Sequence, residues 1–83
     1  MKVAPVYPAR ALQRGLEGYV IVEFTVTPAG TTRDAVVVES TSTLFERAAV
    51  EAALKFKYKP RVIDGEAVEV PGVQNKISFE ITK

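Results

Sequence analysis

The chain has 83 residues, the size of one small domain with a correspondingly small hydrophobic core. Its net charge of +1 supplies no overall field for nucleic acid or a membrane surface, and no apolar run approaches the ~18 residues that span a bilayer. Cysteine and histidine are both absent, which excludes disulfides, thiolate chemistry and the side chain that most often serves as general base and metal ligand.

The first residues are rich in proline and predict an extended arm over residues 1–7. Pro8 suits the first position of a helix, because its missing N–H would have no partner there. The helix is expected over residues 9–14, with Gly15 as a left-handed stop and Leu16 folding back onto the last turn. So short a helix must dock on the rest of the domain to be stable.

Residues 18–27 predict the central strand, because β-branched and aromatic side chains fill nearly every position. Apolar side chains recur there with period two and therefore share one face of a pleated strand: Val20, Val22, Phe24 and Val26. Turn chemistry follows at Pro28, Ala29 and Gly30.

After that turn, Thr32–Ser40 predicts the return strand of a hairpin. Residues 35–38 are apolar without alternation, so the pattern leaves open which face of this strand is buried. A β-bulge in this strand is compatible with the same run.

The stretch from Thr43 to Glu46 matches a capping box, in which the Thr43 hydroxyl accepts from the Glu46 N–H and the Glu46 carboxylate reaches back. Glu51 and Lys55 are spaced for an i,i+4 ion pair on the outer face of the helix that follows. The helix must end before Pro60. Its apolar face is formed by Phe45, Ala48, Ala49, Ala52, Ala53 and Phe56.

Asp64 and Gly65 give a tight-turn signal, and residues 66–70 are extended until Pro71-Gly72 interrupts them. The last strand is expected over residues 73–81. Alternation places one set of its side chains on the apolar face, interrupted by Asn75: Val73, Ile77, Phe79 and Ile81.

The order helix, strand, strand, helix, strand predicts an α+β domain, with a three-stranded antiparallel sheet and two helices on one face. The longer helix carries the chain back across the sheet, so the last strand lies antiparallel to the central one, on its free side. It is then an edge strand with a row of unpaired backbone N–H and C=O groups. Such an edge can accept an extended peptide.

Other chemistry is weakly represented. Four cations, Lys55, Lys57, Lys59 and Arg61, with Phe56 and Tyr58 between them, are compatible with a nucleic-acid or acidic-protein contact, but a solvated helix end is favoured in a nearly neutral chain. The acids at 64, 66 and 69 do not match the spacing of a calcium loop. The serines have no histidine partner, so no catalytic, metal or cofactor site is predicted and the chain is not expected to be an enzyme.

Several short pieces follow one another in a specific order across nearly the whole chain: Tyr7-Pro8-Ala9-Arg10-Ala11, Glu17-Gly18-Tyr19-Val20, Phe24-Thr25-Val26-Thr27-Pro28-Ala29-Gly30, Phe45-Glu46-Arg47-Ala48-Ala49, Phe56-Lys57-Tyr58-Lys59-Pro60, Gly65-Glu66-Ala67-Val68 and Phe79-Glu80-Ile81. In this order they resemble the C-terminal domain of TonB, the periplasmic energy transducer of Gram-negative bacteria. Two positions depart from the family pattern. Ala4 stands where members often have glutamine, and Phe56 stands where many have tryptophan.

The resemblance implies that residues 1–83 form a single TonB C-terminal-like domain of a protein whose membrane anchor and proline-rich spacer lie outside this chain. It implies a periplasmic location, with the full-length protein anchored in the inner membrane. The implied partners are TonB-dependent outer-membrane receptors, bound through their TonB box, and an ExbB/ExbD-type complex reached through the missing N-terminal part. The implied function is transfer of proton-motive-force energy for siderophore or vitamin import, without a cofactor.

The implied peptide site is the last strand, where the TonB box would add through Val73, Gln74, Asn75, Lys76, Ile77, Ser78 and Phe79. Accessory contacts are expected from Pro5, Val6, Tyr7 and Arg10. For Tyr7 an equal alternative is a structural role, in which it staples the arm to the sheet.

Three other functions stay open at this point. A TolA-like or other cell-envelope interaction domain would share the fold without affinity for the TonB box. A self-associating domain, including a homodimer of the isolated fragment, would pair its open edge with a second copy. A small nucleic-acid binder would use the basic cluster and would weaken steeply with salt, whereas strand addition depends on salt only weakly. The nearly neutral charge argues against nucleic acid as a partner.

Overall fold

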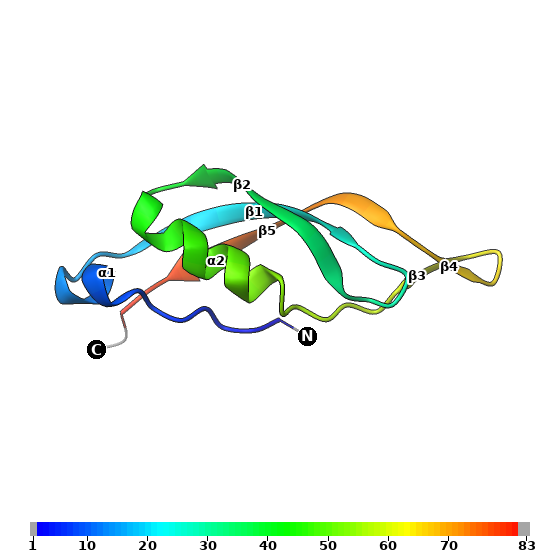
Figure 1. Cartoon of the computed structure of the whole chain (residues 1–83), viewed down its shortest axis with the longest axis horizontal. Coiled ribbons are helices and arrows are strands. Elements are labelled where there is room, and N and C mark those ends of the chain that lie inside the picture. Colours follow the sequence, from blue (N-terminus) through cyan, green and yellow to red (C-terminus); the bar gives the residue numbers. More distant parts are fainter. Residues whose placement is uncertain (1, 82–83) are drawn as a thin grey trace.

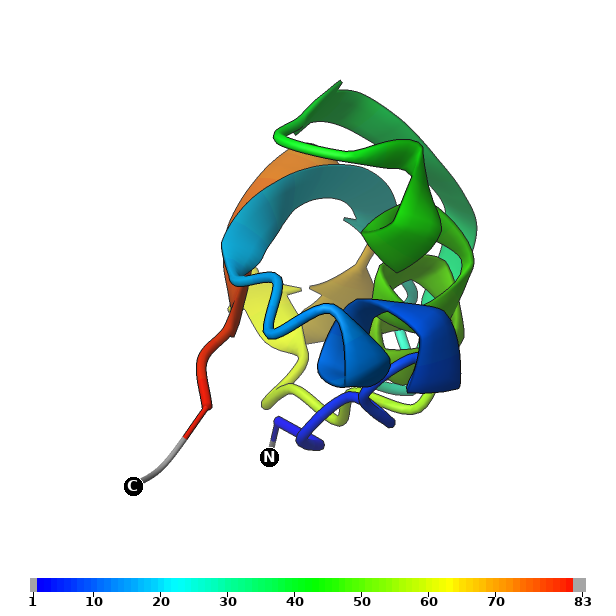
Figure 2. The same cartoon turned by 90° about the vertical axis from the view of Figure 1, so that its left-hand side faces the viewer.

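The computed structural model describes residues 2–81. One sheet of three antiparallel strands, in the order β2-β1-β5, carries the helices on one face, and a small hairpin of β3 and β4 projects beyond its end (Figure 1). Viewed end-on, the sheet curls around the helices and the N-terminal arm (Figure 2). The elements along the chain are α1 (Ala9–Gln13), β1 (Gly18–Val26), β2 (Thr32–Ser40), η1 (Thr43–Phe45), α2 (Glu46–Ala53), β3 (Arg61–Ile63), β4 (Glu66–Val68) and β5 (Val70–Phe79).

β1 is the central strand, as its composition predicts. Its alternate side chains enter the core and are at most 5% exposed: Val20, Val22, Phe24 and Val26. The opposite face of β1, which includes Tyr19 and Ile21, is only partly buried. The period-two pattern therefore predicted both the strand and its buried face.

α1 ends in the left-handed turn that Gly15 predicts. Gly15 has φ +63°, its N–H donates to the Leu12 carbonyl at 3.1 Å, and the Leu16 N–H donates to the Ala11 carbonyl at 2.9 Å. These two bonds form a Schellman motif. Pro8 was expected to be the first helical residue. Its backbone is extended, so it is the N-cap, one position before the helix.

β2 follows the expected bounds and contains irregular pairing. Its register with β1 shifts between Ile21 and Val22 and again before Thr25. Ala35 and Val37 lie on the helix side and are partly buried, whereas Val36 and Val38 are 53% and 48% exposed. The face that the sequence left open is thus decided by the bulged pairing with β1.

The prediction of a capping box at Thr43 is wrong. The chain enters α2 through the 3₁₀ turn η1, so the cap falls one residue earlier, and Ser42 Oγ accepts from the Leu44 N–H at 3.2 Å. The Glu46 carboxylate instead accepts from Ser40 Oγ at 2.5 Å. In place of a capping box, two separate hydroxyl contacts hold the start of the helix.

The outer face of α2 also differs from expectation. The ion pair of Glu51 is with Arg47, one turn earlier, at 3.4 Å. Lys55 lies beyond the end of the helix at Ala53, so it loses the i,i+4 geometry that the spacing suggested. The inner face is as predicted, since Ala49, Ala52 and Ala53 are buried and let the helix lie close to the sheet.

Two aromatic groups fill the core between α2 and the sheet. Phe45 stacks on Phe79 of β5 with centroids 4.4 Å apart, and Phe24 of β1 meets Phe56 edge-on at 6.1 Å. All four rings are at most 2% exposed. The core therefore joins β1 and β5 to the segments on either end of α2.

The hairpin of β3 and β4 was predicted only as a turn. Asp64 and Gly65 both have positive φ, as a two-residue hairpin turn requires, but the strands on either side pair with each other as a separate sheet. β5 then starts at Val70, earlier than expected. It accommodates Pro71-Gly72 as an irregularity in its pairing with β1 and ends at Phe79.

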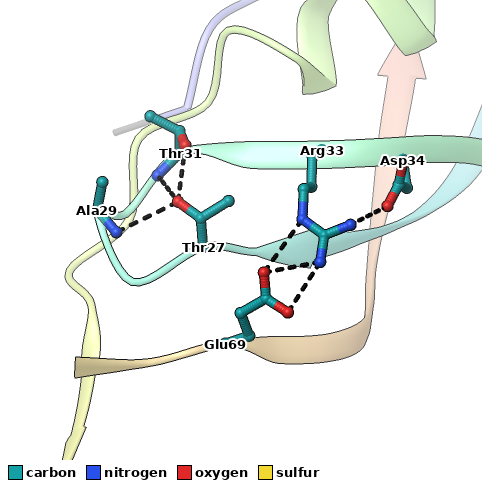
Figure 3. A network of polar contacts seen from close by, with 6 residues as sticks. All are labelled: Thr27, Ala29, Thr31, Arg33, Asp34 and Glu69. Atoms are coloured by element: carbon teal, nitrogen blue, oxygen red, sulfur yellow. Dashed lines mark hydrogen bonds and ion pairs between the residues drawn. The ribbon is translucent and has the colours of Figure 1, made fainter. Parts of the chain in front are cut away.

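An ion pair holds the base of this hairpin against β2 (Figure 3). The Arg33 guanidinium donates to both oxygens of Glu69, with Nη2 at 2.8 and 2.7 Å, and also contacts Asp34. In the turn between β1 and β2, the Thr27 hydroxyl accepts from the N–H groups of Ala29 and Thr31, each at 3.3 Å. Both networks lie at the same end of the sheet.

Candidate functional site

The two edges of the main sheet differ in regularity. β2 pairs with β1 through two register shifts, which twist an edge away from further pairing. Residues 73–79 of β5 pair with β1 without any shift. Of the two outer strands, β5 therefore offers the regular template for an added strand.

Tyr19 shows which β5 groups face outward. Its N–H donates to Thr41 Oγ1 at 3.0 Å and its C=O accepts from the Thr41 N–H at 3.0 Å, so both groups point to the β2 side. Backbone groups alternate in direction along an antiparallel strand, so the partner of Tyr19 on β5, Ser78, directs its own groups away from β1. The same holds for Lys76 and Gln74. We call the outward N–H and C=O groups of these three residues the β5 edge.

The remaining residues of the predicted site bond inward. By the same alternation, backbone groups of four residues pair with β1: Val73, Asn75, Ile77 and Phe79. Their side chains lie on the core side of the sheet, where Ile77 and Phe79 are buried. Within the strand, alternate residues thus separate into those that hold the fold and those that offer backbone groups.

The side chains on the solvent face of β5 lean back over β1. Gln74 Nε2 donates to Glu23 Oε1 at 2.9 Å, and Lys76 Nζ lies 4.4 Å from the centre of the Tyr19 ring. A lysine on an edge strand ordinarily hinders pairing. Here a cation–π contact holds it over the sheet, which leaves the β5 edge accessible.

The Tyr19 phenol supports this arrangement. Its hydroxyl donates to the Glu39 carboxylate, and that hydrogen bond, together with the negative charge, raises the pKa of Tyr19 above its usual value. A phenol with the usual pKa of about 10 is already neutral in the physiological range, and an upward shift keeps it so, as a cation–π partner of Lys76 should be.

Backbone features on either side of the β5 edge limit how many residues can pair with an added strand. At one end Pro71 has no N–H to donate, and Gly72 has φ +70° where the register shifts. At the other end the Ile81 N–H donates to Glu17 Oε2 at 2.6 Å. The stretch open to pairing is therefore short. The Glu17 contact was not foreseen, because it joins residues far apart in the sequence.

Tyr7 holds the N-terminal arm to the core beneath β5. Its ring meets Phe45 and Phe79 edge-on at 5.9 and 5.8 Å, and its hydroxyl donates to the Leu16 carbonyl. Burial, followed by the charge of Glu17, raises its pKa. These contacts are those of the structural staple that was one of the two expectations for this residue.

The N-terminal arm runs alongside α2 (Figure 1). Pro5 and Val6 line a groove against α2, and Arg10 is exposed on α1. One arm residue that was not predicted reaches β5, since Lys2 Nζ donates to Asn75 Oδ1 at 2.7 Å. This contact explains how a polar Asn75 is tolerated on the apolar face of the strand.

Metal ligands and membrane-spanning helices are two other features by which residues 2–81 could indicate a function. In that range no group of three or more acidic side chains is placed to hold a metal ion. No helix within the same range has the length and apolar character needed to cross a membrane.

The sequence of this chain is similar to that of a known protein family. A family model described as "Gram-negative bacterial TonB protein C-terminal" matches residues 3–81. Protein TonB of Pseudomonas aeruginosa is 45% identical over 65 residues, which cover 77% of this chain and 19% of that protein. The chain thus spans about a fifth of the length of that relative.

Solved structures show the same fold. The solution structure of the Pseudomonas aeruginosa TonB C-terminal domain is 38% identical, with a TM-score of 0.82 over 100% of this chain and 84% of that one. TonB2 of Vibrio anguillarum is 44% identical, with a TM-score of 0.72 over 99% and 78%. The Helicobacter pylori TonB domain is 31% identical, with a TM-score of 0.67 over 95% and 71%.

The fold defines the class as a small α+β domain whose open three-stranded sheet has one regular outer edge, on β5, and one irregular outer edge, on β2. The matches carry the assignment further, and the chain belongs to the TonB C-terminal family. This is a family of periplasmic, non-enzymatic energy transducers, so the expectation that the chain is not an enzyme is confirmed.

Proposed function

We propose that this domain captures the TonB box of an outer-membrane receptor as an added strand on the β5 edge. The observation that supports this most is the unshifted pairing of residues 73–79 with β1, which leaves the backbone groups of Gln74, Lys76 and Ser78 directed outward in a regular row. Main-chain hydrogen bonds would supply most of the affinity, and side-chain contacts only modest specificity.

Transmission of a pull is the second part of the proposal. Force would enter through the N-terminal arm, which in this proposal would join the domain to the spacer and membrane anchor of a longer protein. Tyr7 of the arm contacts Phe79 of β5 directly, so the path from arm to bound receptor segment is short. An ExbB/ExbD-type complex in the inner membrane would supply the force from the proton-motive force, in support of siderophore or vitamin import.

The location follows from the same proposal. The domain would work in the periplasm of a Gram-negative bacterium, between an inner-membrane anchor and the outer-membrane receptor. Accessory contacts from Pro5, Val6, Tyr7 and Arg10 stay part of the proposal.

The experiment is a titration of the ¹⁵N-labelled domain with a synthetic TonB-box peptide. We expect the largest amide shifts at Gln74, Lys76 and Ser78, with an affinity that changes little between low and high salt. The matched controls are two forms of the same peptide with alternate backbone nitrogens methylated, one in each phase, so that every side chain is kept and one form loses the donors that would face β5. Equal binding of all three peptides, or shifts confined to residues 55–61, would contradict strand addition.

A further inference from the structure

Four cations follow α2 on a segment that the proposed function leaves unused. Their side chains are all exposed, while the residues between them, Phe56, Tyr58 and Pro60, are buried or partly buried. Exposed and buried side chains therefore alternate along the segment as they do in a strand, although residues 56–60 belong to no sheet. We call its exposed side the basic row: Lys55, Lys57, Lys59 and Arg61.

The backbone of the basic row is held in place. The Tyr58 N–H donates to the Gly30 carbonyl at 2.8 Å, and the Tyr58 ring packs on Phe24 with centroids 5.8 Å apart. Gly30 has φ +85°, and a Cβ there would collide with the Tyr58 carbonyl oxygen. Close packing on the β1–β2 turn thus fixes where the cations project.

Three cations of the row, Lys55, Lys59 and Arg61, differ from the other cations nearby in their ion pairing. Arg33 and Arg47 form ion pairs with acids. Within residues 2–81, by contrast, Lys55, Lys59 and Arg61 form none. Lys55 lies in the turn that closes α2. Beyond it, burial alternates along residues 56–61 as in an extended chain, where alternate side chains recur about every 6.6 Å, so Lys57, Lys59 and Arg61 are spaced at that repeat.

We propose that the basic row docks an extended acidic segment of a partner protein, with carboxylates at alternate positions. Such a segment has the same repeat as the row and the complementary charge. Single-stranded nucleic acid fits less well, because the aromatic rings that could stack on bases face the core. A flat anionic bilayer fits less well because Asp64 and Glu66 are exposed on the adjoining hairpin and would be repelled.

The test uses a blocked heptapeptide with glutamate at every second position and serine between. At low salt we expect amide shifts centred on residues 55–61, and we expect the affinity to fall steeply with added salt. The control peptide has glutamine in place of each glutamate and should not bind. Equal binding of the glutamine peptide would overturn the proposal, as would the absence of shifts at millimolar glutamate peptide.

Two variants with the same change in net charge locate the site. Lys59→Glu should weaken glutamate-peptide binding at least fivefold, whereas Arg14→Glu, at the exposed end of α1, should leave it within twofold. Equal losses in the two variants would mean attraction to net charge alone and would overturn the proposal. An unchanged thermal midpoint shows that each variant is folded, and Lys59→Gln repeats the test with a smaller change.

Two further probes exclude the other partners. Tighter binding of an oligothymidylate, or of phosphatidylglycerol vesicles with no response to the peptide, would refute a protein partner. These probes do not involve the β5 edge. The proposal for the basic row can therefore fail while the proposed TonB-box binding holds, and the reverse is also true.

Discussion

Truncating Phe79 tests whether the contact between β5 and the helices holds the domain together. The side chain is 1% exposed, stacks on Phe45 at 4.4 Å and meets Tyr7 edge-on at 5.8 Å. Phe79→Ala removes an apolar transfer energy of about 1.5–3 kcal/mol. With the cavity that it leaves, we expect a total loss of ~3–5 kcal/mol in the free energy of unfolding.

That loss is large for so small a domain. At roughly 0.05–0.15 kcal/mol per residue, 83 residues hold about 4–12 kcal/mol. We therefore expect the thermal midpoint of Phe79→Ala to fall by at least about 12 °C, since each kcal/mol shifts it by several degrees at this size.

The assay is urea unfolding followed by far-ultraviolet circular dichroism. Val36→Ala is the matched control, because Val36 is 53% exposed on the outer face of β2 and should cost less than about 1 kcal/mol. If Phe79→Ala costs no more than this control, the core has been described wrongly.

Three further predictions concern the cap, the hairpin and pH. Ser42→Ala should lower the free energy of unfolding by ~1 kcal/mol and Thr43→Ala by clearly less, as measured by the same urea unfolding. A larger loss for Thr43→Ala than for Ser42→Ala would indicate that Thr43 caps the helix after all. Arg33→Ala should speed hydrogen exchange in the β3–β4 hairpin with little change in global stability, because its pair with Glu69 is solvent-exposed; unchanged exchange would show that the pair does not hold the hairpin. The raised pKa of Tyr19 in the folded state gives stability that is complete below about pH 10 and is lost as pH rises through the folded-state value. Tyr19→Phe should flatten that alkaline loss in urea unfolding between pH 8 and 11, and an equally steep loss would contradict the assignment.

Local pattern was sufficient where one face of an element meets the core. Alternation in β1 predicted that Val20 and Phe24 are buried, and helical spacing predicted the same for Ala49 and Ala53. Gly15 stopped α1 because its positive φ is a property of the residue itself. Each of these features depends on neighbours within one turn or one strand.

Features that depend on pairing could not be read from the sequence. The buried face of β2 follows from bulges opposite Ile21 and before Thr25, and the cap at Ser42 follows from a 3₁₀ turn that competes with an equally plausible capping box at Thr43. The β3–β4 sheet has too few residues for a periodic signal, although Asp64-Gly65 marked its turn.

For the candidate site, too, some features could be predicted from the sequence and others could not. The topology argument predicted that the last strand is an edge, which the strand order confirms. Which β5 residues face outward depends on the direction of the Tyr19 backbone groups, and the contacts of Lys2 and Glu17 with this strand join distant residues. No local signal encodes such contacts.

The most direct measurement of the central claim is a pair of proline substitutions at adjacent residues. Lys76→Pro removes an outward N–H and spares the ladder with β1, so the domain should fold, because proline is tolerated at such edge positions. Lys76→Ala keeps the donor and is the matched control. Asn75→Pro removes an inward N–H and should destabilise the fold.

Folding is checked by circular dichroism, and affinity for a TonB-box peptide is measured by amide titration. If the β5 edge is the binding site, Lys76→Pro is folded and binds at least tenfold more weakly, a loss of about 1.4 kcal/mol, while Lys76→Ala binds nearly as the wild type does. If a folded Lys76→Pro domain binds the peptide with unchanged affinity, strand addition at the β5 edge is wrong.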